Sequence, residues 1–132
     1  MGLAIIIAAN SALVAQAQSI QEQADCAKQA EKAFQDYASG AAPGQKFLTR
    51  DYQSHYNQKL NKCLILINEI FESDGHAGSS AALLDAFEGR VFASYFFSGK
   101  KRADCQLTPL IKTTFCLSRD EFDRFVSKYM EQ

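Results

Sequence analysis

The chain has no excess of basic residues, because its 132 residues include 14 Lys and Arg against 15 Asp and Glu, a net charge of −1. Nucleic-acid-binding domains normally carry a strong basic excess or a basic stripe. The composition therefore argues against a nucleic-acid partner. The run Lys100-Lys101-Arg102 is short and follows a glycine, which is typical of a solvated loop.

Common catalytic and cofactor-binding motifs are also missing. The hydrolase signatures G-x-S-x-G and H-E-x-x-H do not occur, and there is no glycine-rich phosphate loop. The gaps between the cysteines are 36, 41 and 10 residues, whereas a structural zinc site needs ligands paired at C-x2-4-C spacing. We therefore expect no catalytic set, no metal and no cofactor.

The N-terminal 21 residues lack any charged side chain. They contain an interrupted apolar run, too short for the ~20 residues of a membrane span, and then Ala15-Gln16-Ala17, a pattern that signal peptidase accepts. This layout predicts a signal peptide at residues 1–17 and one domain at 18–132, periplasmic or secreted, with no stable membrane span after cleavage. The basic start of an ordinary signal is lacking, so an uncleaved anchor or a merely apolar helix stays open.

The four cysteines, Cys26, Cys63, Cys105 and Cys116, lie in the part that would remain after cleavage. An even number in a short exported chain indicates a disulfide framework. Four cysteines allow three connectivities, and the sequence alone does not choose between them. We favour Cys105–Cys116, because a reversal near Pro109 could bring them together, which leaves Cys26–Cys63 to tie the first helix to the first strand.

Helices are predicted at both ends of this domain. Ser19 and Glu22 form a capping box, followed by apolar residues at helical spacing as far as Tyr37. A second capping box, Ser118 to Glu121, precedes an apolar face that begins at Phe122.

Strands are predicted between the helices. Residues 62–72 indicate a strand covered on both faces at its start, 73–79 a loop, and 83–97 a hairpin that reverses at Glu88-Gly89-Arg90. Two short strands are expected around 105–108 and 112–116, while 47–61 suits either a helical turn or a hairpin arm. The expected fold is α+β: an N-terminal helix, an antiparallel sheet of about four to five strands and a C-terminal helix, braced by disulfides.

A cluster of polar and aromatic residues is the best candidate binding site: Tyr52, His55, Tyr56 and Asn57. An imidazole beside phenols and an amide could bind a sugar, a peptide end or a metal, and a histidine can act as a general base. The plainer interpretation is a partly buried histidine bonded to the backbone. His76 is expected to be exposed and idle.

The segments Ser54-His55-Tyr56-Asn57, Asp85-Ala86-Phe87-Glu88-Gly89 and Ser118-Arg119-Asp120-Glu121-Phe122, together with Cys63, Cys105 and Cys116, resemble small exported proteins of proteobacteria. The resemblance covers most of residues 18–132. It implies export and a similar fold, and it implies no activity.

Three hypotheses of function follow. The first is a non-enzymatic periplasmic or secreted binding module, with an envelope protein, a peptide or a glycan as its partner. The second is a small hydrolase or metal-dependent enzyme that uses His55, which would need a carboxylate, cysteine or second histidine nearby. The third is a structural or stress-related envelope protein.

Overall fold

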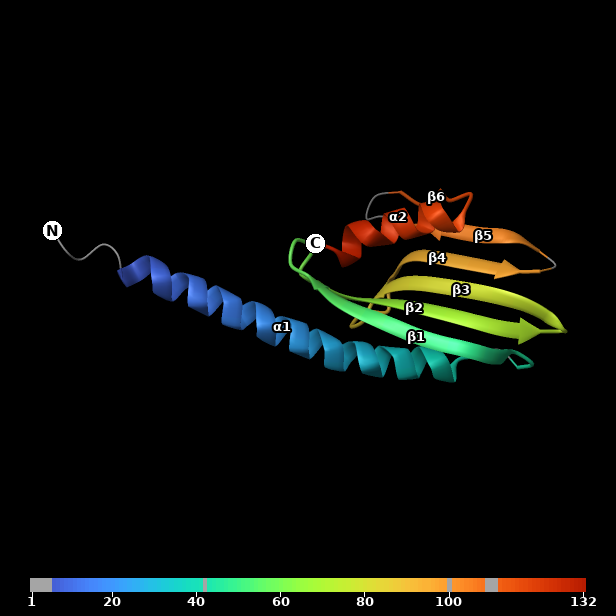
Figure 1. Cartoon of the computed structure of the whole chain (residues 1–132), viewed down its shortest axis with the longest axis horizontal. Helices are drawn as coiled ribbons and strands as arrows, with labels where there is room; N and C mark the ends of the chain where they lie inside the picture. Colours follow the sequence, from blue (N-terminus) through green and yellow to red (C-terminus); the bar gives the residue numbers. More distant parts are fainter. Residues whose placement is uncertain (1–5, 42, 100, 109–111) are drawn as a thin grey trace.

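The computed structural model describes residues 6–41, 43–99, 101–108 and 112–132, with side chains from residue 19 onward except at 101 and 102. It contains two helices and six strands (Figure 1). Their bounds are α1 (Ile6–Ser39), β1 (Lys46–Asn57), β2 (Lys62–Ser73), β3 (His76–Asp85), β4 (Val91–Ser98), β5 (Lys101–Leu107), β6 (Thr114–Phe115) and α2 (Arg119–Met130).

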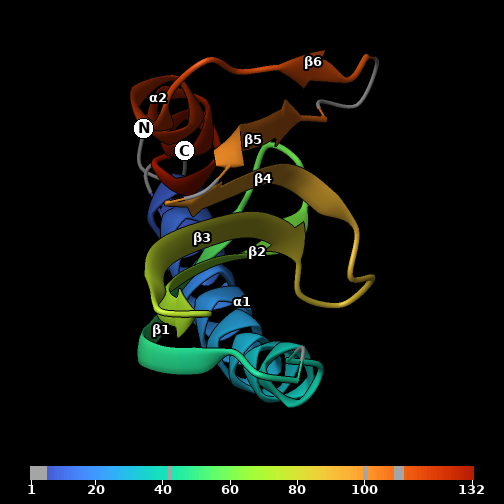
Figure 2. The same ribbon diagram turned by 90° about the vertical axis from the view of Figure 1, so that its right-hand side faces the viewer.

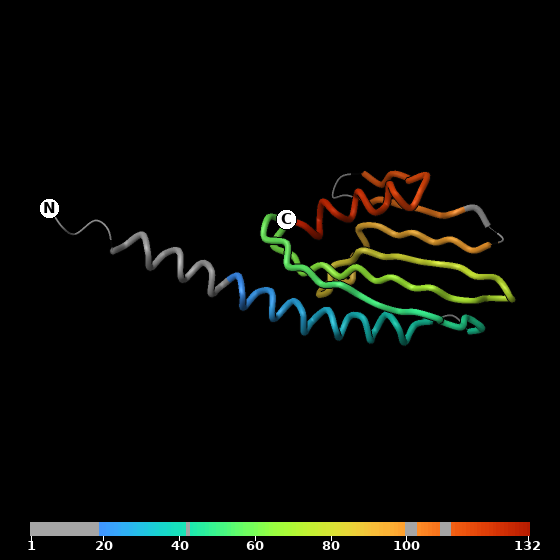
Figure 3. The backbone as a smooth tube through the Cα atoms, in the orientation of Figure 1, coloured from blue at the N-terminus to red at the C-terminus, as the bar shows by residue number. Residues whose placement is uncertain are grey.

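The strands form one sheet in the order β1-β2-β3-β4-β5-β6, and each neighbouring pair is antiparallel. Each strand therefore lies beside the next one along the chain, as the tube in Figure 3 shows. The predicted α+β class is confirmed. The strand count is six rather than four to five, because the ambiguous segment after residue 46 forms the long edge strand β1.

The predicted loop at 73–79 is wrong. Only Asp74 and Gly75 form the turn, with φ angles of 52° and 74°, and β3 already begins at His76. A two-residue turn with both φ angles positive favours Asp-Gly, because its twist matches that of the flanking strands. Asp74-Gly75 is therefore a hairpin signal in the sequence, which the prediction of a loop did not use.

The helices cover opposite faces of the sheet (Figure 2). Side chains along β2 alternate, so that Cys63, Ile65 and Ile67 pack toward α1 while Leu64 packs with the α2 side. The continuous apolar run of β2 therefore fills two cores, as the sequence predicted. The α1 core consists of Cys26, Ala30, Cys63, Ile65, Ile67, Ala82, Leu84 and Ala86, and the α2 core of Leu64, Ala81, Leu83, Phe92, Ala93, Cys105, Cys116, Phe122 and Val126.

Both favoured cysteine pairings are confirmed. Cys26 and Cys63 join α1 to β2, with their Cα atoms 5.2 Å apart, and Cys105 and Cys116 join β5 to the residue after β6, at 5.1 Å. Cys63 lies in the second strand rather than the first. Each disulfide therefore fixes one helix-bearing end of the chain to the sheet.

Of the two helices, α2 begins where the sequence predicts and α1 does not. At α2, the Ser118 hydroxyl accepts a hydrogen bond from the Glu121 N–H at 3.2 Å, and the Glu121 carboxylate accepts one from the Leu117 N–H at 2.7 Å. This confirms Ser118 as the N-cap of the second capping box, whereas the return bond of Glu121 goes to the residue before the N-cap. The first capping box, at Ser19, is wrong for the chain with residues 1–17 present, because α1 begins at Ile6 and Ser19 lies inside the helix. Neither helix of the described residues is long and apolar enough to cross a bilayer.

Candidate functional site

The four residues predicted as one binding cluster are divided between two faces of β1. Tyr52 and Tyr56 pack on the α1 side, where the Tyr52 ring lies 4.7 Å from that of Phe34. Asn57 is buried on the α2 side and donates a hydrogen bond from Nδ2 to the Tyr129 carbonyl oxygen at 2.9 Å. His55 also faces α2. Since successive side chains of a strand point to opposite faces, residues 52 to 57 do not form a single site.

His55 lies in a shallow pocket of about 380 Å³ between β1 and α2. Its Nε2 is 2.7 Å from the main-chain carbonyl oxygen of Gln132. The nearby Asp123 carboxylate accepts a hydrogen bond from Arg119 at 2.8 Å. Among the described residues, no side-chain carboxylate is bonded to His55, and no group of three or more His, Cys, Asp or Glu side chains could hold a metal. The geometry therefore matches the plainer interpretation, a histidine bonded to the backbone.

A larger pocket, of about 440 Å³, lies between α1 and the turn that joins β3 to β4. We call it the helix–turn pocket. Figure 2 shows this turn curling toward α1. Polar and apolar residues of both the helix and the turn line it: Gln29, Lys32, Ala33, Asp36, Tyr37, Leu84, Asp85, Ala86, Phe87, Glu88, Gly89 and Val91.

The helix wall of this pocket is a stripe at positions 29, 32, 33, 36 and 37, which is the spacing of one helical face. Its neighbouring face, with Cys26 and Ala30, is buried in the α1 core. The stripe therefore sits at the border of the packed face. Lys32 and Asp36 form no ion pair within the described part of the chain, so both charges are free to meet a ligand.

The turn wall combines partly exposed apolar residues with the carboxylates of Asp85 and Glu88. Phe87 and Val91 are 65% and 44% exposed, and Leu84 and Ala86 continue the wall into the α1 core. A large exposed aromatic beside a pocket is an informative departure from ordinary burial. The wall is also tied to the helix, because Gln29 donates a hydrogen bond from Nε2 to the Ala86 carbonyl oxygen at 2.9 Å.

Asp85 holds this turn in shape. One carboxylate oxygen accepts hydrogen bonds from the N–H groups of Phe87 and Glu88, at 2.9 and 3.1 Å, and the other accepts one from the Lys62 ammonium at 2.8 Å. Burial opposes ionisation of Asp85, but the hydrogen bonds from Lys62, Glu88 and Phe87 outweigh it and hold its pKa below the ordinary value. The hydrogen bonds that Lys62 donates to Asp85 and Glu88 raise the pKa of Lys62.

A buried ionic cluster closes the far end of α1 against the sheet. Glu69, only 7% exposed, is paired with Arg50 at 2.7 Å and accepts a hydrogen bond from the Ser80 hydroxyl at 2.8 Å. Arg50 also donates to the Ala38 carbonyl oxygen at 3.2 Å. Burial, together with the Glu69 carboxylate, raises the pKa of Tyr37. These charges satisfy one another, so we assign them a structural role.

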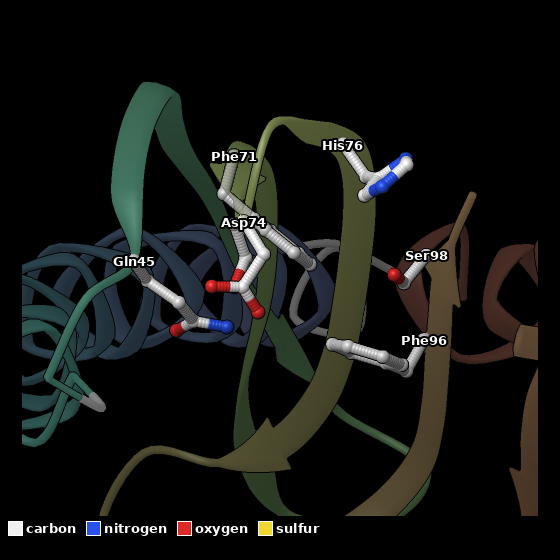
Figure 4. A pocket seen from close by; sticks show the side chains of 7 residues that line it. Gln45, Phe71, Asp74, His76, Phe96 and Ser98 are labelled. Atoms are coloured by element: carbon white, nitrogen blue, oxygen red, sulfur yellow. The ribbon is translucent and has the colours of Figure 1, made fainter. Parts of the chain in front are cut away.

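The smallest pocket described, of about 210 Å³, lies at the opposite end of β3 from the helix–turn pocket (Figure 4). We call it the aromatic pocket. Phenylalanine side chains and five polar side chains line it: Gln45, Phe71, Ser73, Asp74, His76, Phe96 and Ser98. His76, expected to be idle, is therefore part of a pocket wall.

Sequence reasoning missed both pockets because neither is local in the chain. The helix–turn pocket joins residues 29–37 to 84–91, and the aromatic pocket joins Gln45 to Ser98. The one feature of the sequence that could have pointed to the first is a phenylalanine, Phe87, directly before the predicted Glu88-Gly89-Arg90 reversal. No protein-family model, curated protein or solved structure was found to match this chain.

Proposed function

We propose that this protein is an exported, non-enzymatic binding module that takes a peptide segment into the helix–turn pocket. One observation carries the proposal: an exposed apolar wall at Phe87 and Val91 faces a helix stripe with the free charges of Lys32 and Asp36. An apolar wall with a few convergent polar groups is the usual make-up of a ligand pocket, and the volume falls within the usual ~300–1,000 Å³.

A peptide matches both walls at once. An aliphatic or aromatic side chain of the ligand would cover Phe87 and Val91 and remove their apolar surface from water. Its charged groups would pair with Lys32 and Asp36 across the pocket. The cost of ordering the site is small, because Cys26–Cys63 and the Gln29 hydrogen bond already fix the helix to the turn.

The experiment selects phage-displayed peptides on the protein recovered from the periplasm of an expressing bacterium. Titration calorimetry then measures the affinity of an enriched peptide. We expect Phe87→Ser and Lys32→Glu each to weaken binding by about tenfold or more, about 1.4 kcal/mol. Phe115→Ser is the matched control for the aromatic substitution, because Phe115 is 73% exposed. Lys28→Glu is the control on the same helix, one turn before Lys32.

Failure to enrich any peptide would contradict the proposal. So would a peptide whose affinity is unchanged by Phe87→Ser but falls with Phe115→Ser, since its site would then lie at β6.

Export is a separate part of the proposal. It is supported by the disulfides Cys26–Cys63 and Cys105–Cys116, which persist in oxidising compartments, and by the pattern of residues 1–17. A mass spectrum of the recovered protein should match residues 18–132, and reduction should add the mass of four hydrogens. A mass that still includes residues 1–17 would overturn cleavage, and four free thiols would overturn the oxidised state.

A further inference from the structure

The aromatic pocket has a floor of packed phenylalanine rings. The Phe71 and Phe96 rings are stacked with their centroids 5.5 Å apart, and Phe47 meets Phe71 edge-on at 6.3 Å. Phe71 is buried, whereas Phe96 is 38% exposed and presents part of its ring to the pocket. The floor is thus a flat apolar surface that is held in place from beneath.

A glycine allows this arrangement. A Cβ atom on Gly78 would lie 2.5 Å from the Phe71 ring and 2.8 Å from the Phe97 carbonyl oxygen. Only the bare backbone of β3 leaves room for the ring to lie across the strand. The position of Phe71, and through it that of Phe96, is therefore fixed by the backbone rather than by neighbouring side chains that could move.

Polar groups surround the floor on two sides. In Figure 4, Gln45 and Asp74 extend toward one another on one side of the pocket, and His76 and Ser98 stand on the other, with Phe71 between the two sides and Phe96 below Ser98. The side-chain hydrogen bonds and ion pairs found in the described part of the chain involve none of the four polar side chains. An amide, a carboxylate, an imidazole and a hydroxyl thus remain available to a ligand.

The phenylalanine floor and the polar side chains around it together favour one class of ligand. A flat ring favours a ligand with a flat apolar face, and the surrounding donors and acceptors favour a ligand with hydroxyls at its edge. The pocket carries one carboxylate and no Lys or Arg, so it offers an anion no permanent positive charge. Its 210 Å³ lies below the range of drug-sized ligands and suits a single small ring.

We infer that the aromatic pocket binds one ring of a neutral sugar, with the ring face on Phe96 and its hydroxyls bonded to the side chains of Gln45, Asp74, His76 and Ser98. The inference is independent of the peptide proposal, since the two pockets share no residue. The sugar is either free or the end of a glycan chain, which are the two sources that the experiment separates.

The test titrates the ¹⁵N-labelled protein with a panel of neutral hexoses and N-acetylhexosamines and, in parallel, applies the protein to an array of glycans. We expect saturable shifts at Phe96 and His76 for at least one sugar, with a dissociation constant of about 1 mM, since one small ring makes few contacts. Array binding in addition to solution binding assigns the site to a glycan end, and solution binding alone assigns it to a free sugar.

The matched variants are Phe96→Leu and Phe97→Leu. These neighbours in β4 are 38% and 42% exposed and point to opposite faces of the sheet. Phe96→Leu, which keeps an apolar side chain but removes the ring, should weaken binding at least tenfold, whereas Phe97→Leu should leave it unchanged. Gln45→Ala gives a second test, because Gln45 lies before β1 and its replacement leaves the phenylalanine rings unchanged. This variant should also bind the sugar more weakly.

Three results would overturn the inference: no sugar in the panel produces saturable shifts, binding survives both Phe96→Leu and Gln45→Ala, or Phe97→Leu weakens it equally. Because Phe96 packs on Phe71, the amide spectrum of each variant is compared with that of the unmodified protein. A Phe96→Leu variant that fails to fold leaves Gln45→Ala as the deciding variant.

Discussion

Asp85 is 2% exposed, although it carries a charge and belongs to a turn. Acidic residues at a hairpin turn commonly keep it soluble, but Asp85 has a different role. Its carboxylate satisfies two N–H groups of the turn and the Lys62 ammonium. A buried carboxylate is tolerated only when it is bonded in this way, so the turn and the ion pair depend on each other.

Replacing Asp85 with Asn should destabilise the protein by about 2 kcal/mol at neutral pH, because charge-assisted hydrogen bonds are lost inside the protein. In the unfolded chain the pKa of an Asp side chain is about 3.9. In the folded protein the pKa of Asp85 lies below that value. Its contribution is therefore present above that pH and is lost as the pH falls through the folded-state pKa. Urea unfolding from pH 7 to pH 3 should show the difference between the two proteins shrinking below about pH 4.

The control for this prediction is Asp104→Asn, an exposed carboxylate in β5. A destabilisation by Asp85→Asn that stays constant down to pH 3 would contradict the role given to its ionised form.

Replacing Gly78 with Ala should destabilise the protein by about 1–3 kcal/mol, the usual cost of forcing extra atoms into a packed core. The new Cβ atom would overlap the Phe71 ring, and the nearby Phe97 carbonyl oxygen prevents the strand from shifting away. The matched control is Gly40→Ala, where a Cβ atom would make only an ordinary contact of 3.5 Å. Equal unfolding midpoints in urea for the two variants would contradict this reading of the aromatic floor.

Among the elements, α2 is the one that the sequence specifies most fully. Ser118 begins it, Glu121 closes the capping box, and Phe122 and Val126 are buried on one face. These signals all lie within one stretch of 15 residues, so they could be interpreted without knowing the fold. The strand β2 was equally clear, because an apolar run between two faces needs no partner to be recognised.

The edge strand β1 was ambiguous for a physical reason. Tyr52 and Tyr56 are four residues apart, which fits both one face of a helix and one face of a strand. The outer edge of β1 near Tyr56 is covered by α1, where the Gln23 amide accepts from the Tyr56 N–H and donates to its carbonyl oxygen, both at 3.1 Å. No pattern in residues 47–61 alone could reveal this contact, which crosses 33 positions.

Replacing Ser118 with Ala should destabilise the protein by about 1 kcal/mol, the usual value for a lost N-cap. The Glu121 N–H would lose its acceptor at 3.2 Å, and α2 would begin less firmly. Ser127→Ala is the matched control in the same helix, because its hydroxyl donates to the Asp123 carbonyl oxygen, which already serves the helix. Thermal unfolding of both variants measures the difference, and an equal loss in the two would contradict the capping role.

At the scale of the whole molecule, the fold class was predictable and the favoured cysteine pairing proved right, but the pockets were not predictable. Composition, segregated strands and terminal helices specify α+β packing without any distances. A pocket depends on how closely Phe87 approaches Lys32, and that distance is set by the curvature of the sheet and by the Cys26–Cys63 bond. The Cys26–Cys63 bond closes a longer loop than the Cys105–Cys116 bond, so the two disulfides should stabilise the fold by different amounts.

Replacing both Cys26 and Cys63 with Ser should destabilise the protein by about 4 kcal/mol, against about 3 kcal/mol for Cys105 and Cys116, since the cost grows with loop length. The sequence separations are 37 and 11 residues. Urea unfolding of the two double variants gives both values. If the Cys105–Cys116 variant proves the less stable of the two, loop length does not govern their contribution.

The strands pair in chain order, and the cysteines do so as well: the first bonds to the second and the third to the fourth. A chain that crosses a membrane from its N-terminus presents Cys26 and Cys63 to the oxidising side before Cys105 arrives. An oxidant that joins thiols in the order of their emergence makes the native bonds directly, with no wrong bond to exchange. We therefore predict that the export proposed above needs a disulfide oxidase but no disulfide isomerase, and that the yield in a strain without the isomerase matches that in the parent strain.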